Sequence, residues 1–329
     1  MLHRRFTILI LAFAMIFSLC GCDSGKKSSS TKITIALDWT PNTNHTGIYV
    51  AKELGYFDAV GIEIEIIEAL ESGAEAVVAS GVAQFGISFQ DYLVPAFSAT
   101  KEEQLPITAV AAIIQHNTSG IISPAKLGIT SPKQLAGKSY ATWELPIEQA
   151  IISQVMKNDG ADFSDVELIP QYVENLQGAF DSNIDAVWIY YGWDGVNAEL
   201  NELDTNFFYF KDYAPELDYY SPVIIGNNEF LENNPEIVSD FLDAIQKGYE
   251  YSIENPEDAA KILVDANEGM DLELCIASQK WLSDKYIADA KSWGVIDENR
   301  WNAFFDWVYE NGLCEYEIPD NYGFTNQYN

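Results

Sequence analysis

The chain has 329 residues and a formal net charge of −32, with 50 Asp and Glu against 18 Lys and Arg. Such an acidic chain is repelled by nucleic acid and by anionic lipid, so neither is expected as a partner. The 48% hydrophobic and 13% aromatic content excludes a disordered acidic chain and predicts a well-packed globular protein. A cationic ligand and a solvated extracellular surface are both compatible with the charge.

The first 21 residues have the pattern of a secretory signal peptide. Arg4 and Arg5 precede an apolar run over 6–19, which is shorter than the ~20 residues of a typical transmembrane helix. The run ends in Leu-Cys-Gly-Cys, which resembles a bacterial lipobox, so we expect cleavage after residue 21 and lipidation of Cys22. The alternative is an ordinary signal peptide with a chance Cys. Residues 22–31 would then be a polar tether, and the protein would be extracytoplasmic and lipid-anchored to the cell membrane.

Strands and helices alternate along the rest of the chain. Apolar or alternating runs predict strands, whereas amphipathic runs with caps and glycine stops predict helices. In the first unit the predicted strands are 33–37, 62–67, 85–89, 107–114 and 120–123, and the predicted helices are 43–54, 73–80 and 91–99. In the second unit the predicted strands are 138–143, 166–169, 184–191 and 207–210, and the predicted helices are 131–135, 146–157, 176–180 and 192–203.

The chain then returns to the first unit. Residues 221–225 predict a strand, and the helices that follow are predicted at 235–253, 256–265, 272–286 and 298–311. This order predicts an α/β protein with two lobes, each a mainly parallel sheet flanked by helices, and a ligand cleft between them. We expect lobe 1 to comprise 32–122 with 222–329, lobe 2 to comprise 123–221, and the hinge to lie near 121–124 and 214–222.

The few cysteines and histidines limit which disulfides and metal sites the protein can form. Cys275 and Cys314 remain after processing, and outside the cytoplasm they either form one disulfide or stay free. Only His45 and His116 remain, and no CxxC or HExxH spacing occurs. The sequence therefore predicts neither a metal site nor a cofactor.

Polar and aromatic residues follow two strands of the first unit. The loop after 33–37 carries Asp38, Trp39, Asn42 and His45, and the strand 85–89 leads into Ser88 and Gln90. Strand ends that precede helices are favoured ligand sites in α/β proteins. Trp39 would offer a flat ring face, and Asn42 and Gln90 would offer a donor with an acceptor. The structural alternatives are capping for Asn42, core packing for Trp39, loop orientation for Asp38 and His45, and solvent exposure for Gln90.

The second unit offers a matching set of strand-end residues. Trp143 and Glu144 follow one strand, and an aromatic-acidic cluster ends another, comprising Tyr190, Tyr191, Trp193 and Asp194. A carboxylate at Asp194 would accept from an amino group and a protonated ring nitrogen. Core packing is the alternative for the aromatic residues, and a favourable helix N-terminal charge is the alternative for Glu144.

Several stretches together resemble one family. KITIALDWTPNTNHTGIYVAKELGYF, GVAQFGISFQ and NPEDAAKIL resemble solute-binding lipoproteins of ABC importers in the nitrate, sulfonate, taurine and thiamine-precursor group. DWTPNTNHTG is most similar to the branch that binds thiamine pyrimidine precursors. The resemblance implies the type II periplasmic-binding-protein fold and covers nearly the whole mature chain. Trp143 and Glu144 depart from the small or hydroxyl residues of the anion binders, and Asp194 is shorter than the Glu of many relatives.

The resemblance implies a function without catalysis. It implies capture of hydroxymethylpyrimidine, or a formylamino or aminomethyl pyrimidine, by a monomer that delivers it to an ABC permease and its ATPase. The alternatives are another small solute, such as a riboflavin-type ring, a sulfonate or a cationic amine, or an enzyme like the fungal pyrimidine synthases. Those relatives use a Cys-rich motif that this chain lacks. A purely structural surface lipoprotein is a third class.

Overall fold

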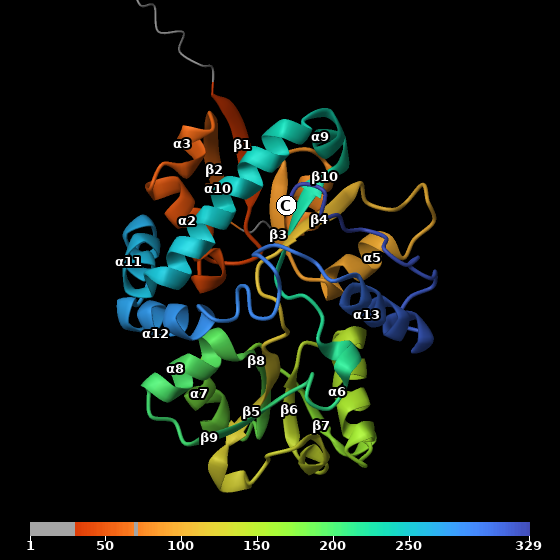
Figure 1. Cartoon of the computed structure of the whole chain (residues 1–329). Coiled ribbons are helices and arrows are strands. Elements are labelled where there is room, and N and C mark those ends of the chain that lie inside the picture. The colour runs from red at the N-terminus through yellow and green to blue at the C-terminus, as the bar shows by residue number, and fades with distance from the viewer. Residues whose placement is uncertain (1–29, 69–71) are drawn as a thin grey trace, which may run out of the picture. The chain divides into compact units, whose positions relative to one another are not determined.

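The computed structural model describes residues 30–68 and 72–329 (Figure 1). The expected signal peptide, Cys22 and nearly all of the polar tether lie outside the described residues. Residues 31–329 form one unit by their contacts, and this unit contains two five-stranded sheets. No helix within the described residues has the length and apolar character needed to cross a membrane.

The first sheet has the strand order β2-β1-β3-β10-β4. β1 is parallel to β2 and β3, whereas β10 is antiparallel to both β3 and β4. A strand from late in the sequence therefore lies between two early strands. The strands are β1 (Thr31–Ala36), β2 (Ile62–Ile67), β3 (Phe85–Ser88), β4 (Ile107–Ala112) and β10 (Val223–Asn227).

The second sheet has the strand order β7-β6-β8-β5-β9. β6 is parallel to β7 and β8, and β5 is antiparallel to β8 and β9. Both sheets are thus mixed, with a parallel half and an antiparallel half. The strands are β5 (Ser119–Pro124), β6 (Ser139–Thr142), β7 (Glu167–Pro170), β8 (Ala186–Tyr190) and β9 (Thr205–Tyr209).

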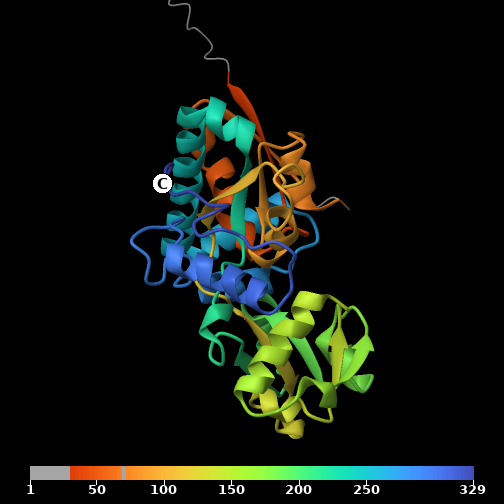
Figure 2. The same ribbon diagram turned by 90° about the vertical axis from the view of Figure 1, so that its right-hand side faces the viewer.

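Helices cover both faces of each sheet (Figures 1 and 2). The sequence predicts most of them, but it misses α3 and α9. The helices of the first sheet are α2 (Thr46–Glu53), α3 (Tyr56–Ala59), α4 (Gly73–Ala79), α5 (Val94–Phe97), α9 (Asn228–Asn233), α10 (Pro235–Glu254), α11 (Pro256–Ala266), α12 (Leu272–Leu282) and α13 (Glu298–Glu310). The helices of the second sheet are α6 (Pro146–Asn158), α7 (Leu176–Asp181) and α8 (Val196–Leu200).

The long helix α10 packs on the first sheet through the apolar face that the sequence predicts. Its buried residues include Val238, Phe241, Leu242 and Ile245, at the spacing of one helical face. Phe241 stacks on Phe85 of β3, with the ring centroids 3.9 Å apart. This packing holds the first residue of β3 against α10.

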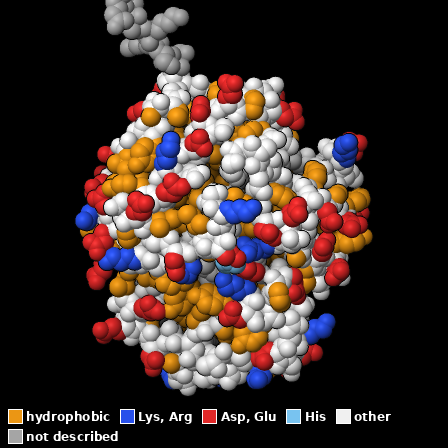
Figure 3. Space-filling model, viewed as in Figure 1, with side chains coloured by type: hydrophobic (Ala, Val, Ile, Leu, Met, Phe, Trp, Pro, Cys, Tyr) orange, Lys and Arg blue, Asp and Glu red, His pale blue; other side chains and the backbone are white. Residues whose placement is uncertain are grey.

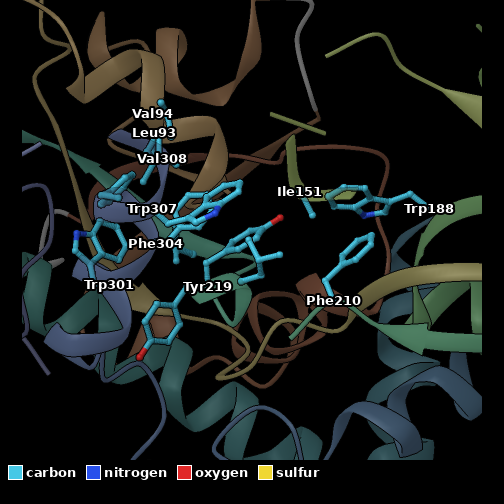
Figure 4. Close-up of a cluster of buried hydrophobic side chains, with 14 of the residues drawn as sticks. Leu93, Val94, Ile151, Trp188, Phe210, Tyr219, Trp301, Phe304, Trp307 and Val308 are labelled. Carbon is cyan, nitrogen blue, oxygen red and sulfur yellow. The ribbon is translucent and has the colours of Figure 1, made fainter. Parts of the chain in front are cut away.

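One buried core runs across the junction of the two sheets. It includes Trp188 and Phe210 beside the second sheet, and Trp301 and Phe304 of α13 beside the first. Figure 4 shows Tyr219 lying between these two groups. The return segment after β9 is therefore part of the core and not a loose linker.

The first crossing between the sheets lies earlier than the sequence predicts. The chain leaves the first sheet after Ala112 and enters the second at Ser119, because β5 pairs with β8 and β9. Residues 119–122, which were expected in lobe 1, therefore belong to the second sheet. The return lies between Tyr209 and Val223, and it contains the predicted segment 214–222. Cys275 and Cys314 both have free thiols.

Candidate functional site

A buried histidine holds the loop after β1. The Asn42 N–H donates to His45 Nδ1 at 3.2 Å, and His45 Nε2 lies 2.7 Å from Asp38 Oδ1. Because a backbone N–H can only donate, Nδ1 is the accepting nitrogen and Nε2 carries the ring proton that bonds Asp38. The His45 ring is fully buried. The structure therefore favours loop orientation over ligand contact for His45.

Asn42 also acts within this loop. Its Oδ1 accepts from the Asn44 N–H at 2.9 Å, and its Nδ2 donates to the Thr40 carbonyl at 3.1 Å. This is an N-cap arrangement, which was the structural alternative for Asn42. Trp39, in contrast, is 48% exposed, so its ring is available to a partner. Asp38 and Trp39 remain the candidate ligand contacts of the loop.

The polar residues at the end of β3 are buried and bonded to protein groups. Gln90, predicted as a ligand-reading amide, is fully buried. Its Nε2 donates to the Trp301 carbonyl at 2.8 Å, and its Oε1 accepts from the Tyr220 N–H at 3.0 Å. The amide thus joins β3 to the return segment and to α13. Ser88 is buried as well, and its hydroxyl donates to the Glu75 carboxylate.

Glu148 organises the loop after β6. Its buried carboxylate accepts from the Thr142 hydroxyl at 3.0 Å and from the Trp143 N–H at 3.1 Å. Trp143 and Glu144 are both exposed, and Glu144 has a φ of 62°. The Trp143 ring lies 5.5 Å from that of Trp188. Trp143 and Glu144 therefore project from a loop that Glu148 keeps in place.

The two tyrosines at the end of β8 have different neighbours. The Tyr190 ring stacks on Phe89, with the centroids 5.9 Å apart and 26° between the planes. The Tyr191 ring lies 5.4 Å from that of Trp281 in α12, and its hydroxyl donates to Glu199. Tyr190 therefore meets the end of β3, whereas Tyr191 packs beside α8 and α12.

Ser278 of α12 joins the loop after β1 to the turn after β8. Its hydroxyl donates to the Gly192 carbonyl and lies 2.5 Å from Thr43 Oγ1. A Cβ on Gly192 would lie 3.0 Å from the side chains of Leu282 and Trp281, so glycine allows α12 to approach this closely. The two candidate regions are thus linked through one helix.

Trp193 and Asp194 lie in a π-helical turn over Tyr191–Gly195 that leads into α8. Both side chains are half-buried. Burial raises the pKa of Asp194 to about 6, although the N–H groups of Tyr190 and Asp194 partly offset this effect. Asp194 is therefore a carboxyl that folding makes easier to protonate.

We expect Asp194→Asn to stabilise the protein above pH 6. A carboxyl whose folded-state pKa is raised contributes stability below the unfolded value of 3.8 and loses it as the pH rises through about 6. Removing the charge should therefore raise the free energy of unfolding by about 1–2 kcal/mol at pH 8, and by much less at pH 4. Urea denaturation at both pH values measures the difference. Equal effects at the two values would contradict the burial of Asp194.

Side chains from both sheets converge where β3, β8 and the return segment meet. Burial, followed by the charges of Asp91 and Tyr92, raises the pKa of Tyr190 well above its ordinary value, and Asp38 adds to the effect. The charge of Asp38 therefore reaches Tyr190, so these two residues of different sheets lie in the same part of the molecule. We call this set the junction cluster: Asp38, Phe89, Asp91, Tyr92, Tyr190, Tyr219 and Ser221.

Five members of the junction cluster are absent from the sequence-predicted site. Phe89, Asp91 and Tyr92 continue directly from Ser88, so the strand-end rule that selects Ser88 could have included them. Tyr219 and Ser221 lie in the return segment, and no sequence signal brings that segment to the end of β8. Its position depends on β10, which pairs with β3 across more than a hundred residues.

One family model matches most of the chain. The family described as NMT1/THI5 like matches residues 42–259. The chain belongs to this family. The matched region contains every member of the junction cluster except Asp38, and it includes all five strands of the second sheet.

Relatives of this NMT1/THI5-like chain include both binding proteins and synthases. The formylaminopyrimidine-binding protein of Halalkalibacterium halodurans is 27% identical, over 96% of this chain and 96% of that protein. The 4-amino-5-hydroxymethyl-2-methylpyrimidine phosphate synthase THI11 of Saccharomyces cerevisiae is 24% identical, over 91% of this chain and 88% of that protein. The family alone therefore does not separate binding from catalysis.

Solved structures establish the fold. The periplasmic aliphatic sulphonate-binding protein SsuA of Escherichia coli has a TM-score of 0.67 at 16% identity, over 88% of this chain and 96% of that chain. The alkanesulfonate-binding protein SsuA of Xanthomonas axonopodis pv. citri, bound to MOPS, has a TM-score of 0.63 at 12% identity, over 89% and 98%. This NMT1/THI5-like chain therefore has the periplasmic-binding-protein fold.

A separate hollow lies on the second sheet. Its cavity volume is about 450 Å³, and its lining includes Tyr191, Glu199, Phe207 and Tyr209. None of the lining residues belongs to the junction cluster, so the hollow is distinct from the region where both sheets meet. Within the described residues, no group of three or more His, Cys, Asp or Glu is placed to hold a metal ion.

Proposed function

We propose that this protein is the extracytoplasmic solute-binding component of an ABC importer and captures a thiamine pyrimidine precursor. The observation that carries the proposal is the convergence of both sheets at the junction cluster. There Phe89 and Tyr190 bring one half-buried ring from each sheet together, beside Asp38 and Asp91.

The chemistry of the junction cluster suits a planar amino-heterocycle. Aromatic rings stack on a flat ligand, and each such contact contributes about 0.5–1.5 kcal/mol beyond the burial of area. Carboxyl oxygens accept from amino groups, whereas they repel an anion such as a sulfonate. Acidic side chains are also spread over the visible face of the molecule (Figure 3). The ligand is therefore a neutral or cationic ring rather than an anion.

The comparisons support this assignment. The relative named as a formylaminopyrimidine-binding protein aligns along nearly the full length of both chains. We place the ligand in a cleft between lobe 1 and lobe 2, with the two chain crossings as the hinge, so that closure on the ligand is what the permease and ATPase detect. Lipidation at Cys22 would anchor the monomer at the membrane.

A pyrimidine synthase is the second candidate, because several relatives carry that name. The two described histidines argue against it. His45 is buried in the loop after β1, and His116 lies between the carboxylates of Asp218 and Asp289, at 2.6 and 3.0 Å. Formation of a pyrimidine product by the purified protein with pyridoxal phosphate and iron would establish the synthase.

Calorimetry with 4-amino-5-hydroxymethyl-2-methylpyrimidine tests the binding proposal. We expect saturable heat with the wild-type protein and none with methanesulfonate. Tyr190→Ala should weaken pyrimidine binding roughly tenfold or more, because the ligand loses one stacking ring. Tyr316→Ala, which removes a 42% exposed ring, is the matched control and should bind normally. The absence of binding to any of a panel of aminopyrimidines, including the formylamino compound, would refute the proposal.

A further inference from the structure

Three buried polar atoms of the junction cluster have no hydrogen-bond partner of normal geometry. They are Asp91 Oδ1, the Tyr219 hydroxyl and the Ser221 hydroxyl. Tyr219 and Ser221 are 0% and 1% exposed, and Asp91 is 8% exposed. All three are neighbours of Tyr190 or of one another, since Asp91 influences the titration of both Tyr190 and Tyr219, and Ser221 interacts with Tyr190.

A buried polar atom without a hydrogen-bond partner destabilises the folded protein. A buried donor or acceptor that lacks a partner costs about 1–3 kcal/mol. Gln90, which follows the same strand, has partners for both ends of its amide. The other buried side-chain atoms without a partner in the described residues are the indole N–H groups of three tryptophans, Trp188, Trp293 and Trp307. Asp91, Tyr219 and Ser221 lie where the two sheets meet, so the polar edge of a ligand bound there would give their unsatisfied oxygens partners.

The surroundings of Asp91 favour its protonated form. Burial raises the pKa of Asp91 to about 7, and the charge of Glu75 adds to this effect. The N–H groups of Asp91 and Tyr92 oppose it, and the Tyr219 hydroxyl, which approaches Asp91 without the geometry of a hydrogen bond, opposes it to a smaller extent. Other titratable groups that interact with this region are Tyr92, Tyr190 and Asp38. A protonated carboxyl presents one donor beside one acceptor.

The O–H donor and the carbonyl acceptor of a protonated carboxyl match one edge of an aminopyrimidine, where a ring nitrogen that accepts lies beside an amino group that donates. We propose that Asp91 is the specificity-determining residue of the ligand site, donating its carboxyl proton in a hydrogen bond to the ring nitrogen and accepting from the adjacent amino group. The hydroxyls of Tyr219 and Ser221 supply further partners for the same ligand. The inference rests on the proposed function and names the group that reads the ligand.

If Asp91 donates its proton to the ligand, binding should weaken as the pH rises. The complex contains one proton shared between Asp91 and the ring nitrogen. Above pH 7 the free protein has lost that proton, so ligand binding must take one up. The affinity should therefore fall by up to tenfold per pH unit between pH 7.5 and 9.

Three variants test the proposal by calorimetry with 4-amino-5-hydroxymethyl-2-methylpyrimidine from pH 6.5 to 9. Asp91→Asn keeps a donor beside an acceptor but cannot ionise, so it should bind within a few-fold of wild type at pH 6.5 and show no pH dependence. Asp91→Leu removes both groups and should weaken binding at least tenfold. Asp306→Asn, at an exposed position of α13 whose pKa is also raised by burial and neighbouring acids, should behave as wild type.

Proton uptake gives an independent readout. In buffers of different ionisation enthalpy, wild type should take up close to one proton per ligand at pH 8.5, and Asp91→Asn should take up none. Binding by wild type that is independent of pH, or Asp91→Leu binding as tightly as wild type, would overturn the role of Asp91 and leave the proposed function standing. If wild type binds no aminopyrimidine at any pH, the proposed function itself fails. Thermal melting of each variant establishes that it is folded.

Discussion

Gly248→Ala should lower the free energy of unfolding by about 3 kcal/mol or more. Gly248 of α10 faces Gly47 of α2, and a Cβ at residue 248 would lie 1.9 Å from the Gly47 carbonyl oxygen. The obstacle is backbone, so no side-chain rotation relieves the overlap, and the two helices must separate. In an open helix the same change would stabilise by up to about 1 kcal/mol. Urea denaturation measures the loss.

Gly178→Ala provides the matched control. Gly178 lies in the exposed part of α7, and the nearest atom to a Cβ there is Asn175 Oδ1 at 3.4 Å. This variant should be as stable as wild type or slightly more stable. A Gly248→Ala protein with unchanged stability would mean that α2 and α10 do not cross at these two glycines.

Arg300→Met should lower the free energy of unfolding by about 2 kcal/mol at pH 7. Arg300 of α13 donates to the Gln115 carbonyl at 2.5 Å and lies 5.3 Å from the Tyr220 ring centroid. It also faces Asp218, at 3.6 Å. Gln115 lies in the first crossing, and Asp218 and Tyr220 lie in the return, so one guanidinium ties both crossings to α13.

The pH dependence of the Arg300 effect follows from Asp218. Burial alone would raise the pKa of Asp218, but the hydrogen bond and charge of His116, the charge of Arg300 and the Asn117 N–H outweigh burial and lower it. A lowered pKa gives stability that is present above the unfolded value of 3.8 and is lost as the pH falls through the folded value. The deficit of Arg300→Met should therefore shrink at pH 3.

Lys280→Met is the control for a surface ion pair. Lys280 lies 2.5 Å from Glu257, and both side chains are at least half exposed. Such exposed pairs contribute little, so the change should have no measurable effect on the free energy of unfolding at either pH. If Arg300→Met were equally mild, the two crossings would not depend on the guanidinium.

Local patterns in the sequence predict most of the fold. Ser131 and Pro132 start a short helix with the predicted capping residue, and Gly55, with a φ of 72°, ends α2 as predicted. What the sequence does not predict is which strands become neighbours. The parallel expectation holds for β1 with β2 and β3, but the insertion of β10 makes half of the first sheet antiparallel.

The sequence indicates which strand ends carry the candidate site, but it does not indicate which side chains there are free to contact a ligand. Asp38 lies close enough to Tyr190 for its charge to raise the pKa of Tyr190, whereas Tyr191 packs against Trp281. Gln90 satisfies the strand-end rule, but its amide bonds two distant backbone groups that no local pattern reveals. The direct role of each predicted ligand residue stays a prediction.

The central position of β10 in the first sheet has a consequence for the order of folding. β3 and β4 can pair with β10 only after residue 227 has been synthesised, whereas all strands of the second sheet lie within residues 119–209. The first sheet therefore depends on contacts of higher sequence separation than those that join β5 to β8 and β9 in the second sheet, and such contacts form more slowly. During synthesis the later part of the sequence would complete its sheet first, and the N-terminal strands would wait for it.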